Sequence, residues 1–137
     1  DLITLWHVFE HVYTYDEYFT LFNSSLHKNG KLILALPNCN SADAKMYDEF
    51  WAAYDTPRHL WHFTPKTIAQ FAEKRGFILE EKHRLPLDPF FNTMVSASYK
   101  KSFTFLPITF LKGFWAYLVS LVSIDKSSSL IYVFRKA

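Results

Sequence analysis

The chain has 137 residues, of which 50% are apolar and 19% aromatic, enough for the packed core of one domain. Its formal charge of +2 arises from 15 basic and 13 acidic residues scattered along the chain, so nucleic acid is not an expected partner. Cys39 is the only cysteine, which excludes an internal disulfide and a zinc site built from cysteines. The single cysteine and the lack of a leader-like start predict a cytoplasmic protein.

The first third of the chain has the pattern of two parallel strands joined by a helix. Residues 2–8 (LITLWHV) form an apolar segment typical of a parallel strand buried on both faces, and residues 31–36 (KLILAL) form a second. The segment between them carries apolar residues at helical spacing, namely Tyr18, Phe19, Phe22 and Leu26. A strand–helix–strand unit of this kind is almost always a right-handed crossover.

The middle of the chain combines an irregular segment with a well-marked helix. Residues 37–63 have no clean period and are dense in Trp, His, Asp and Arg, which is typical of a functional loop. Thr64 and Pro65 then predict a helix start, as an N-cap followed by proline in the first turn. Residues 77–85 and 130–136 have the composition of two further strands.

Residues 103–124 form an unusually apolar segment with a single charged residue, Lys112. As a helix, at ~1.5 Å per residue, this segment would approach the thickness of a bilayer. We do not expect it to span a membrane, because the strand at 130–136 must return to the same sheet as the strand at 77–85.

Arranged on a helix, residues 103–124 have one broad apolar stripe, which consists of Leu106, Phe110, Phe114, Leu118 and Leu121. The opposite face is narrow and weakly polar, and it consists of Thr109, Lys112, Ala116, Ser120 and Ser123. We expect something other than water to cover the stripe. Three covers are open: the domain's own core or a lid over a greasy acceptor, a subunit partner, or peripheral contact with a membrane surface.

Polar residues directly follow the first predicted strand. In doubly wound sheets, ligands bind beyond the carboxyl ends of the strands. His7, Glu10 and His11 have the spacing H-x-x-E-H, which places them on one face of a helical turn. Such a trio can bind a divalent metal or transfer a proton, or Glu10 and His11 can simply orient the turn.

Four segments, in this order, resemble the second half of a class I S-adenosylmethionine-dependent methyltransferase. They are DLITLWHVFEHV at 1–12, NGKLILALPN at 29–38, the pattern W-x-x-Y-D-x-P-R-H-L-x-H-F-T-P at 51–65, and R-G-F at 75–77. The most similar branch is related to the ubiquinone-biosynthesis O-methyltransferases. The resemblance covers residues 1–84 and resumes at the last strand.

This resemblance implies an α/β fold that is the C-terminal half of a Rossmann-like sheet. The family's strand order is 3-2-1-4-5-7-6, and strands four to seven, the last one antiparallel, correspond to residues 2–8, 31–36, 77–85 and 130–136. Residues 1–137 then form a single partial, truncated domain: core elements at 1–85, a hydrophobic helical insertion at 86–129 and the last strand at 130–137. Strands one to three, with the glycine-rich cofactor loop, would precede Asp1.

The resemblance also implies a cofactor and a set of site residues. S-adenosylmethionine would contact Leu5, Trp6, His7 and His11. The candidate catalytic residues are His7, Glu10, His11 and His59, and the candidate substrate-binding residues are Trp51, Asp55, Arg58 and His62. Alternatively, Arg58 pairs with Asp55 to fix the loop, Trp51 fills core, and His59 and His62 satisfy backbone groups.

No metal site is predicted from this pattern. Related O-methyltransferases with a divalent metal carry E-x-x-E-H at this point, whereas this chain has His7 in place of the first glutamate and matches only at Glu10 and His11. His59 or His62 would be needed to complete a ligand set.

The leading functional hypothesis is therefore a transferase that moves a methyl group from S-adenosylmethionine to an O or N acceptor. The hydrophobic insertion suggests a small-molecule acceptor that is apolar or lipid-linked, and a membrane-associated protein. The alternative is a non-catalytic binding or assembly module that uses the aromatic insertion. A metal-dependent hydrolase built on His7, Glu10, His11 and His59 lacks an evident nucleophile. Residues 2–8 would form an unprotected sheet edge, from which we expect a homodimer of this chain.

Overall fold

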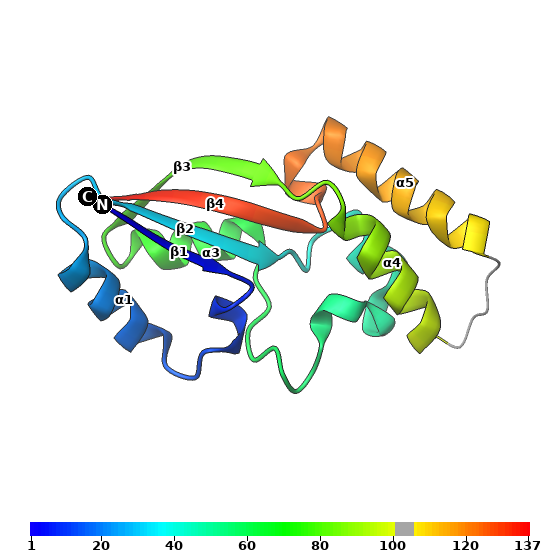
Figure 1. The fold of residues 1–137 in the computed structure, drawn as a ribbon, viewed down its shortest axis with the longest axis horizontal. Helices are drawn as coiled ribbons and strands as arrows, with labels where there is room; N and C mark the ends of the chain where they lie inside the picture. The colour runs from blue at the N-terminus through cyan, green and yellow to red at the C-terminus, as the bar shows by residue number, and fades with distance from the viewer. Residues whose placement is uncertain (101–105) are drawn as a thin grey trace.

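A four-stranded sheet organises the chain in the computed structural model, which describes residues 1–100 and 106–137 (Figure 1). In spatial order the strands are β1 (Leu2–Trp6), β2 (Lys31–Pro37), β4 (Ser129–Lys136) and β3 (Phe77–Arg84). β1 and β2 are parallel, whereas β4 is antiparallel to both β2 and β3. This arrangement confirms the predicted α/β fold with strands four to seven of a methyltransferase sheet.

Two helices cover one face of the sheet. α1 (Tyr15–Ser25) and α3 (Pro65–Glu73) meet there through aromatic rings, and the ring of Phe19 lies 5.6 Å from that of Phe71 and 5.5 Å from that of Phe77. Alternate residues of β2 complete this core, with Leu32, Leu34 and Leu36 fully buried. The residues predicted at helical spacing on α1 and the alternate residues of β2 therefore point into the same core.

The other face of the sheet is open, which corrects the expectation that residues 2–8 are buried on both faces. Leu2 is 59% exposed and Trp6 is 52% exposed. On β3 and β4 this face carries charges: Arg135 Nε donates to Glu80 Oε1 at 2.7 Å. The expectation was wrong because none of the described helices covers this face, so an apolar composition alone does not ensure burial.

The helix starts follow the expected capping chemistry. Thr64 Oγ1 accepts a hydrogen bond from the backbone N–H of Thr67 at 3.1 Å, and Pro65 occupies the first turn of α3. Within 37–63, a short helix α2 (Ala42–Tyr47) and the 3₁₀ turns η2 (Asp48–Phe50) and η3 (Ala52–Tyr54) replace the single irregular loop that we expected. The sequence did not predict α2 because its six residues are too few to show the spacing of apolar residues that marks a helix.

Two further helices form a lobe beyond the carboxyl end of β2 (Figure 1). α4 (Asp88–Tyr99) and α5 (Leu106–Val122) pack against each other, and the turn η4 (Ile124–Lys126) leads into β4. They lie in the predicted insertion 86–129, of which 101–105 is outside the described residues. None of the described helices is both long enough and apolar enough to cross a membrane.

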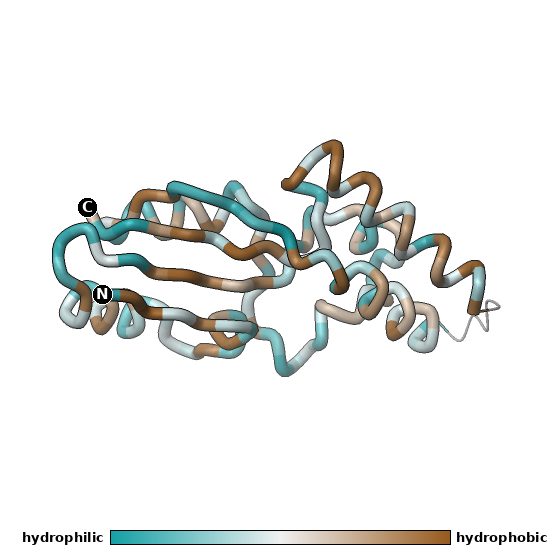
Figure 2. Tube along the Cα trace, turned by 45° about the horizontal axis from the view of Figure 1, so that its top comes forward, coloured by the Kyte–Doolittle hydropathy of each residue, from teal (hydrophilic) through white to brown (hydrophobic). Residues whose placement is uncertain are grey.

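The face of α5 that is buried is the opposite of the face that we expected to be covered. The small residues Thr109, Gly113, Ala116 and Ser120 pack inward. A Cβ atom at Gly113 would lie 2.9 Å from Thr93 Oγ1 and 3.1 Å from the Cα of Phe90, so the two helix backbones approach closely. The apolar stripe faces outward, since all five of its members are exposed: Leu106, Phe110, Phe114, Leu118 and Leu121. Figure 2 shows hydrophobic residues along the length of α5.

Replacing Gly113 with a large helix-forming residue tests this packing. Gly113→Leu should lower the free energy of unfolding by about 2 kcal/mol, because the new side chain has to displace Thr93 and the Phe90 backbone. Leu111→Ala, at an exposed site on the same helix, should change it by less than about 0.5 kcal/mol. Urea denaturation compares the two, and equal stabilities would contradict the close approach of α4 and α5.

The predicted homodimer would form through the open edge of β1, and a proline on this edge tests it. His7 N–H donates to Ala35 O at 3.0 Å, so by strand alternation the N–H of Thr4 points away from β2. Thr4→Pro therefore removes a donor only from the free edge and should convert the expected dimer to a monomer in light scattering. Thr20→Pro, at a helix position, would instead unfold the chain. A wild-type chain that is monomeric at high concentration would contradict the prediction.

Candidate functional site

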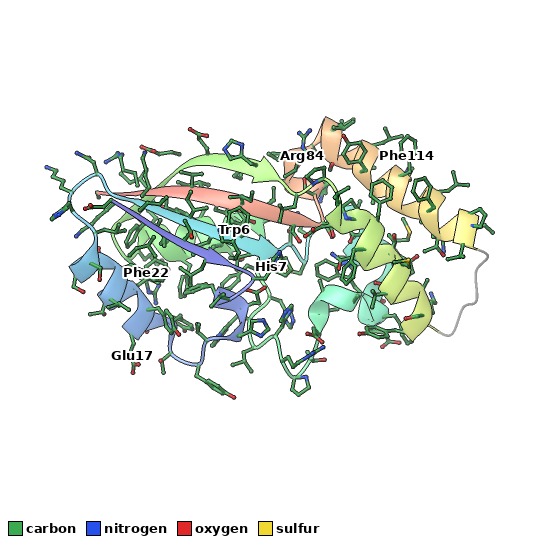
Figure 3. All side chains as sticks on the ribbon, in the orientation of Figure 1. Trp6, His7, Glu17, Phe22, Arg84 and Phe114 are labelled. Carbon is green, nitrogen blue, oxygen red and sulfur yellow. The ribbon has the colours of Figure 1, made fainter. Side chains whose placement is uncertain are left out.

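A cavity of about 420 Å³ lies beyond the carboxyl ends of β1 and β2. Its walls combine the ends of both strands, the segment after α2 and one side of α4. Among the lining residues are His7, Pro37, Asp55, His59, Asp88 and Phe91. This is the position at which doubly wound sheets bind their ligands. His7 lies at this end of β1 and points toward the second lobe (Figure 3).

His7 is held between two carboxylates. Its Nδ1 lies 3.3 Å from Glu10 Oε1, and its Nε2 lies 3.9 Å from Asp88 Oδ2. The backbone of His7 has a positive φ of 51°, which turns the chain sharply out of β1. The hydrogen bond with Glu10 raises the pKa of His7 above its ordinary value, against the effect of burial, and the charge of Asp88 adds to the rise.

Glu10 is the buried centre of the cluster. It lies in the 3₁₀ turn η1 (Phe9–His11) and is 1% exposed, while its carbonyl accepts the N–H groups of Leu60 and Trp61 at 2.9 and 3.2 Å. Its Oε2 has no hydrogen-bond partner among the described residues. Because an unpaired buried carboxylate oxygen is costly, Oε2 of Glu10 is suited to accept a hydrogen bond from a donor group.

His59 comes from a distant part of the chain and faces Glu10. Its Nδ1 lies 2.8 Å from Ala53 O, so Nδ1 carries the proton and donates to this carbonyl. Its Nε2 is then turned toward two carboxylates, 3.9 Å from Glu10 Oε1 and 3.9 Å from Asp55 Oδ2. The imidazole therefore has a fixed orientation and one nitrogen available for chemistry.

His11 completes a group of three potential ligands. Its Nδ1 lies 2.9 Å from Arg58 O, and its ring centroid lies 4.6 Å from that of His59. One ligand atom from each of Glu10, His11 and His59 lies within 4.8 Å of the others. The sequence pattern joins only Glu10 and His11, and the fold brings His59 to them. This geometry can transfer a proton or contribute three ligands to a metal ion.

The candidate substrate-binding residues divide into two groups. Asp55 and Arg58 line the cavity, and they also pair, with Arg58 Nη2 donating to Asp55 Oδ1 at 2.6 Å. His62 and Trp51 do not line it. The ring of His62 bonds to Tyr54 O through Nε2 at 2.9 Å, whereas Trp51 is 2% exposed and lies in the core.

The candidate cofactor-binding residues lie on or just after β1. Leu5 packs against the main hydrophobic core, whereas the side chain of Trp6 projects from the exposed edge strand (Figure 3). His7 and His11 lie on the turn beyond it.

The structure also shows polar residues that the sequence pattern did not single out. Asp43 is fully buried and accepts hydrogen bonds from Trp51 Nε1 at 2.7 Å and from Ser128 Oγ at 2.6 Å. Ser128 in turn accepts from Asn92 Nδ2 at 2.7 Å. These residues lie apart in the sequence, and no spacing rule relates a serine run to a buried aspartate. They position the cavity without lining it, apart from Asn92.

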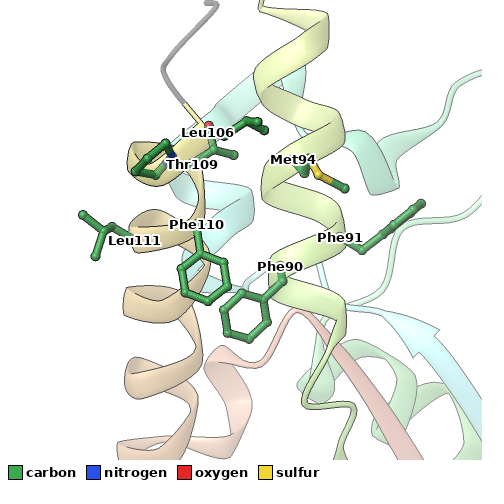
Figure 4. Close-up of a pocket in the computed structure, with 8 residues that line it drawn as sticks. Phe90, Phe91, Met94, Leu106, Thr109, Phe110 and Leu111 are labelled. Atoms are coloured by element: carbon green, nitrogen blue, oxygen red, sulfur yellow. The ribbon is translucent and has the colours of Figure 1, made fainter.

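A second, apolar groove of about 670 Å³ lies between α4 and α5 (Figure 4). Phe90 and Phe110 face each other across the two helices with ring centroids 5.2 Å apart, and Met94, Leu106 and Leu111 line the groove with them. Phe91 lines both this groove and the polar cavity. The two spaces therefore adjoin at one aromatic side chain.

A family described as "Methyltransferase domain" matches residues 1–82, which is more than half of the chain. The chain belongs to this methyltransferase family. Such enzymes use S-adenosylmethionine as their cofactor. No curated protein matched the sequence of the methyltransferase chain.

Solved structures support the same fold. Mycolic acid cyclopropane synthase CmaA1 complexed with SAH and CTAB is 14% identical, with a TM-score of 0.56 over 99% of this chain and 55% of that one. Its apo-form is 13% identical, with a TM-score of 0.53 over 99% of this chain and 58% of that one. At these identities the likeness shows the fold alone. The methyltransferase chain spans little more than half the length of these structures.

The described residues fit S-adenosylmethionine only in part. Trp6 and His7 present exposed side chains at the carboxyl end of β1, where a cofactor could lie against them. A glycine-rich cradle for its polar groups would require glycines at the cavity, and Gly30, Gly76 and Gly113 do not line it. The described cavity therefore has no glycine-rich cradle for the cofactor.

The environment of His7 predicts a pH dependence of stability. Because Glu10 raises the folded-state pKa of His7 above 6.5, the protonated form stabilises the fold at acidic pH, and this contribution is lost as pH rises through the raised value. His7→Asn tolerates the positive φ and removes the titrating ring. The stability difference between wild type and His7→Asn should therefore be greatest below about pH 6.5 and shrink above it.

Urea denaturation at a series of pH values measures this difference, with His62→Asn as a control because the exposed ring of His62 bonds to a backbone carbonyl and not to a carboxylate. A difference that grows as pH rises would show that the contact with Glu10 does not stabilise the protonated ring.

Proposed function

We propose that the protein containing this chain transfers a methyl group from S-adenosylmethionine to an O or N atom of an acceptor that carries an apolar or lipid-like part. The observation that carries the proposal is the position of Phe91, which borders both the polar cavity and the apolar groove. An acceptor could place its reactive polar end beside His59 and its apolar part between α4 and α5. The lipid-like ligand CTAB, bound in one of the structurally similar enzymes, is consistent with this division.

Proton removal from the acceptor is assigned to His59. Its Nδ1 is fixed by Ala53 O, so Nε2 is the free base, and the buried Glu10 carboxylate 3.9 Å away stabilises the imidazolium that forms. His11 packs against the His59 ring and limits its rotation. When bound, S-adenosylmethionine supplies a methyl group activated by a sulfonium, and the rest of the task is positioning.

Residues on or just after β1 are proposed to contact the cofactor, namely Leu5, Trp6, His7 and His11. The remaining cofactor contacts are assigned to a glycine-rich segment outside this sequence, because the described cavity has no glycine in its walls and the chain covers 55% of a structurally similar enzyme. The 137-residue chain alone should then bind S-adenosylmethionine weakly.

Asp55 and Arg58 are proposed to position the acceptor, since both line the cavity. Trp51 and His62 stand outside it and support the loop through the hydrogen bonds to Asp43 and Tyr54. The alternative, a non-catalytic binding module, is favoured only by the exposed face of α5 and gives no role to the oriented His59.

Turnover of the full-length protein tests the proposal. His59→Ala should lower kcat about 100-fold or more, because it removes the base. His62→Ala is the matched control, since His62 also bonds to a backbone carbonyl but lies outside the cavity. The assay supplies S-adenosylmethionine with a labelled methyl group and an apolar extract as the source of acceptors. It measures the rate at which label enters the extract.

Equal losses of kcat in His59→Ala and His62→Ala would show that His59 is not the base. Tight binding of S-adenosylmethionine by the full-length protein with no methyl transfer to any acceptor fraction would favour the binding module instead.

A further inference from the structure

The packing of α5 leaves an apolar surface without a cover. Its small residues turn inward to α4, so its large ones turn outward, including Phe110, Trp115 and Val122, which are 62%, 52% and 91% exposed. At 3.6 residues per turn, the exposed apolar side chains of α5 span an arc of about 200°. A helix in water normally has its apolar arc buried and its polar arc exposed, and α5 has the reverse.

The neighbouring helix extends this surface. Phe91 and Met94 of α4 are 62% and 52% exposed and border the same groove as Leu106 and Leu111 of α5. We call this surface, formed by Phe91, Met94 and the exposed apolar side chains of α5, the α4–α5 apolar face. Contiguous apolar surfaces of this kind are rare on monomers in water and mark interaction sites.

The charge of this part of the chain distinguishes between possible covers. Residues 89–124 contain three lysines, Lys100, Lys101 and Lys112, and no aspartate or glutamate. At the rim, Lys45 of α2 lines a shallow pocket together with the exposed Trp115. Two copies of the face placed against each other would bring like charges together, whereas an anionic lipid surface would meet lysines at its headgroups and apolar side chains beneath them.

The dimensions of α5 favour a helix that lies on a bilayer. It has 17 residues, and none of the described helices is long and apolar enough to cross a membrane. Trp115 is placed beside Lys45, as expected where an indole lies at the level of the headgroups. A helix of this kind lies in the plane of the interface with its apolar side in the acyl region.

We propose that the α4–α5 apolar face docks on the surface of an anionic phospholipid bilayer. Phe114 and Leu118, near the middle of α5, lie in the acyl region, and Lys45 contacts the headgroups. This inference rests on the orientation of α5 and on charge, and does not require the proposed methyl transfer. If both hold, the groove bordered by Phe91 opens where a lipid-linked acceptor resides.

Co-sedimentation of the 137-residue chain with phosphatidylcholine vesicles, with and without phosphatidylglycerol, tests the docking. Wild type should bind the phosphatidylglycerol vesicles. Leu118→Glu should weaken this binding about tenfold or more by placing a charge in the apolar region. Leu21→Glu is the matched control, because Leu21 is a similarly exposed leucine on α1, and it should bind like wild type.

A second pair of variants tests the role of charge. Lys45→Gln should weaken binding roughly fivefold on vesicles with phosphatidylglycerol and leave any binding to pure phosphatidylcholine unchanged. Lys66→Gln, an exposed lysine on α3, is the control and should have no effect. Circular dichroism checks that each variant is folded.

Two results would overturn the proposal. The first is failure of the wild-type chain to bind either kind of vesicle, and the second is an equal loss in Leu21→Glu and Leu118→Glu. In the first case, a dimer that Leu118→Glu dissociates would show that a second copy covers the face.

Discussion

The carboxylate of Asp43, buried away from water, is the constraint on which the carboxyl end of the sheet depends. Burial raises the pKa of Asp43, and the hydrogen bonds from Ser128, Trp51 and Ser41 act in the opposite direction. A buried carboxyl group is costly without donors in a low-dielectric interior, and both Trp51 Nε1 and Ser128 Oγ donate to Oδ2 of Asp43. Helix α2, the turn at Trp51 and the start of β4 are therefore held in one arrangement.

The same network fixes the second lobe against the sheet. Asn92 of α4 reaches Asp43 through Ser128, and Ser96, one turn later, accepts the N–H of Ala52 at 2.7 Å. The segment that begins at Ala52 carries Ala53, whose carbonyl orients His59. The position of a candidate base is thus linked, through a chain of polar contacts, to an aspartate that does not line the cavity.

Much of the fold could be predicted because it depends on local rules. Strand composition, the Thr64–Pro65 start of α3 and the spacing of Phe19 and Phe22 each fix an element by its own residues, and the order of the strands came from the resemblance to a family. The orientation of α5 could not be predicted in this way. Its pattern states which side chains share a face, but which face is buried depends on whether small residues allow two backbones to approach.

The candidate site was predictable to a similar degree. His7, Glu10 and His11 follow from the rule that ligands bind beyond strand ends, and their grouping with His59 required the path of residues 37–63. No sequence pattern pointed to Asp43, Asn92 or Ser128, because hydrogen bonds between residues far apart in the chain leave no periodicity in the sequence. Trp51 was a candidate for substrate binding because of its place in the loop after residues 31–36, with packing in the core as the alternative. Its indole is buried and donates to Asp43.

The two chain ends lie at the same end of the sheet, opposite the cavity (Figure 1). Lys31 N–H donates to Asp1 O at 3.1 Å and Ala137 N–H donates to Gly76 O at 2.9 Å, so each end is tied to the amino end of β2 or β3. An affinity tag or fusion partner at either terminus is therefore remote from His7 and from α5.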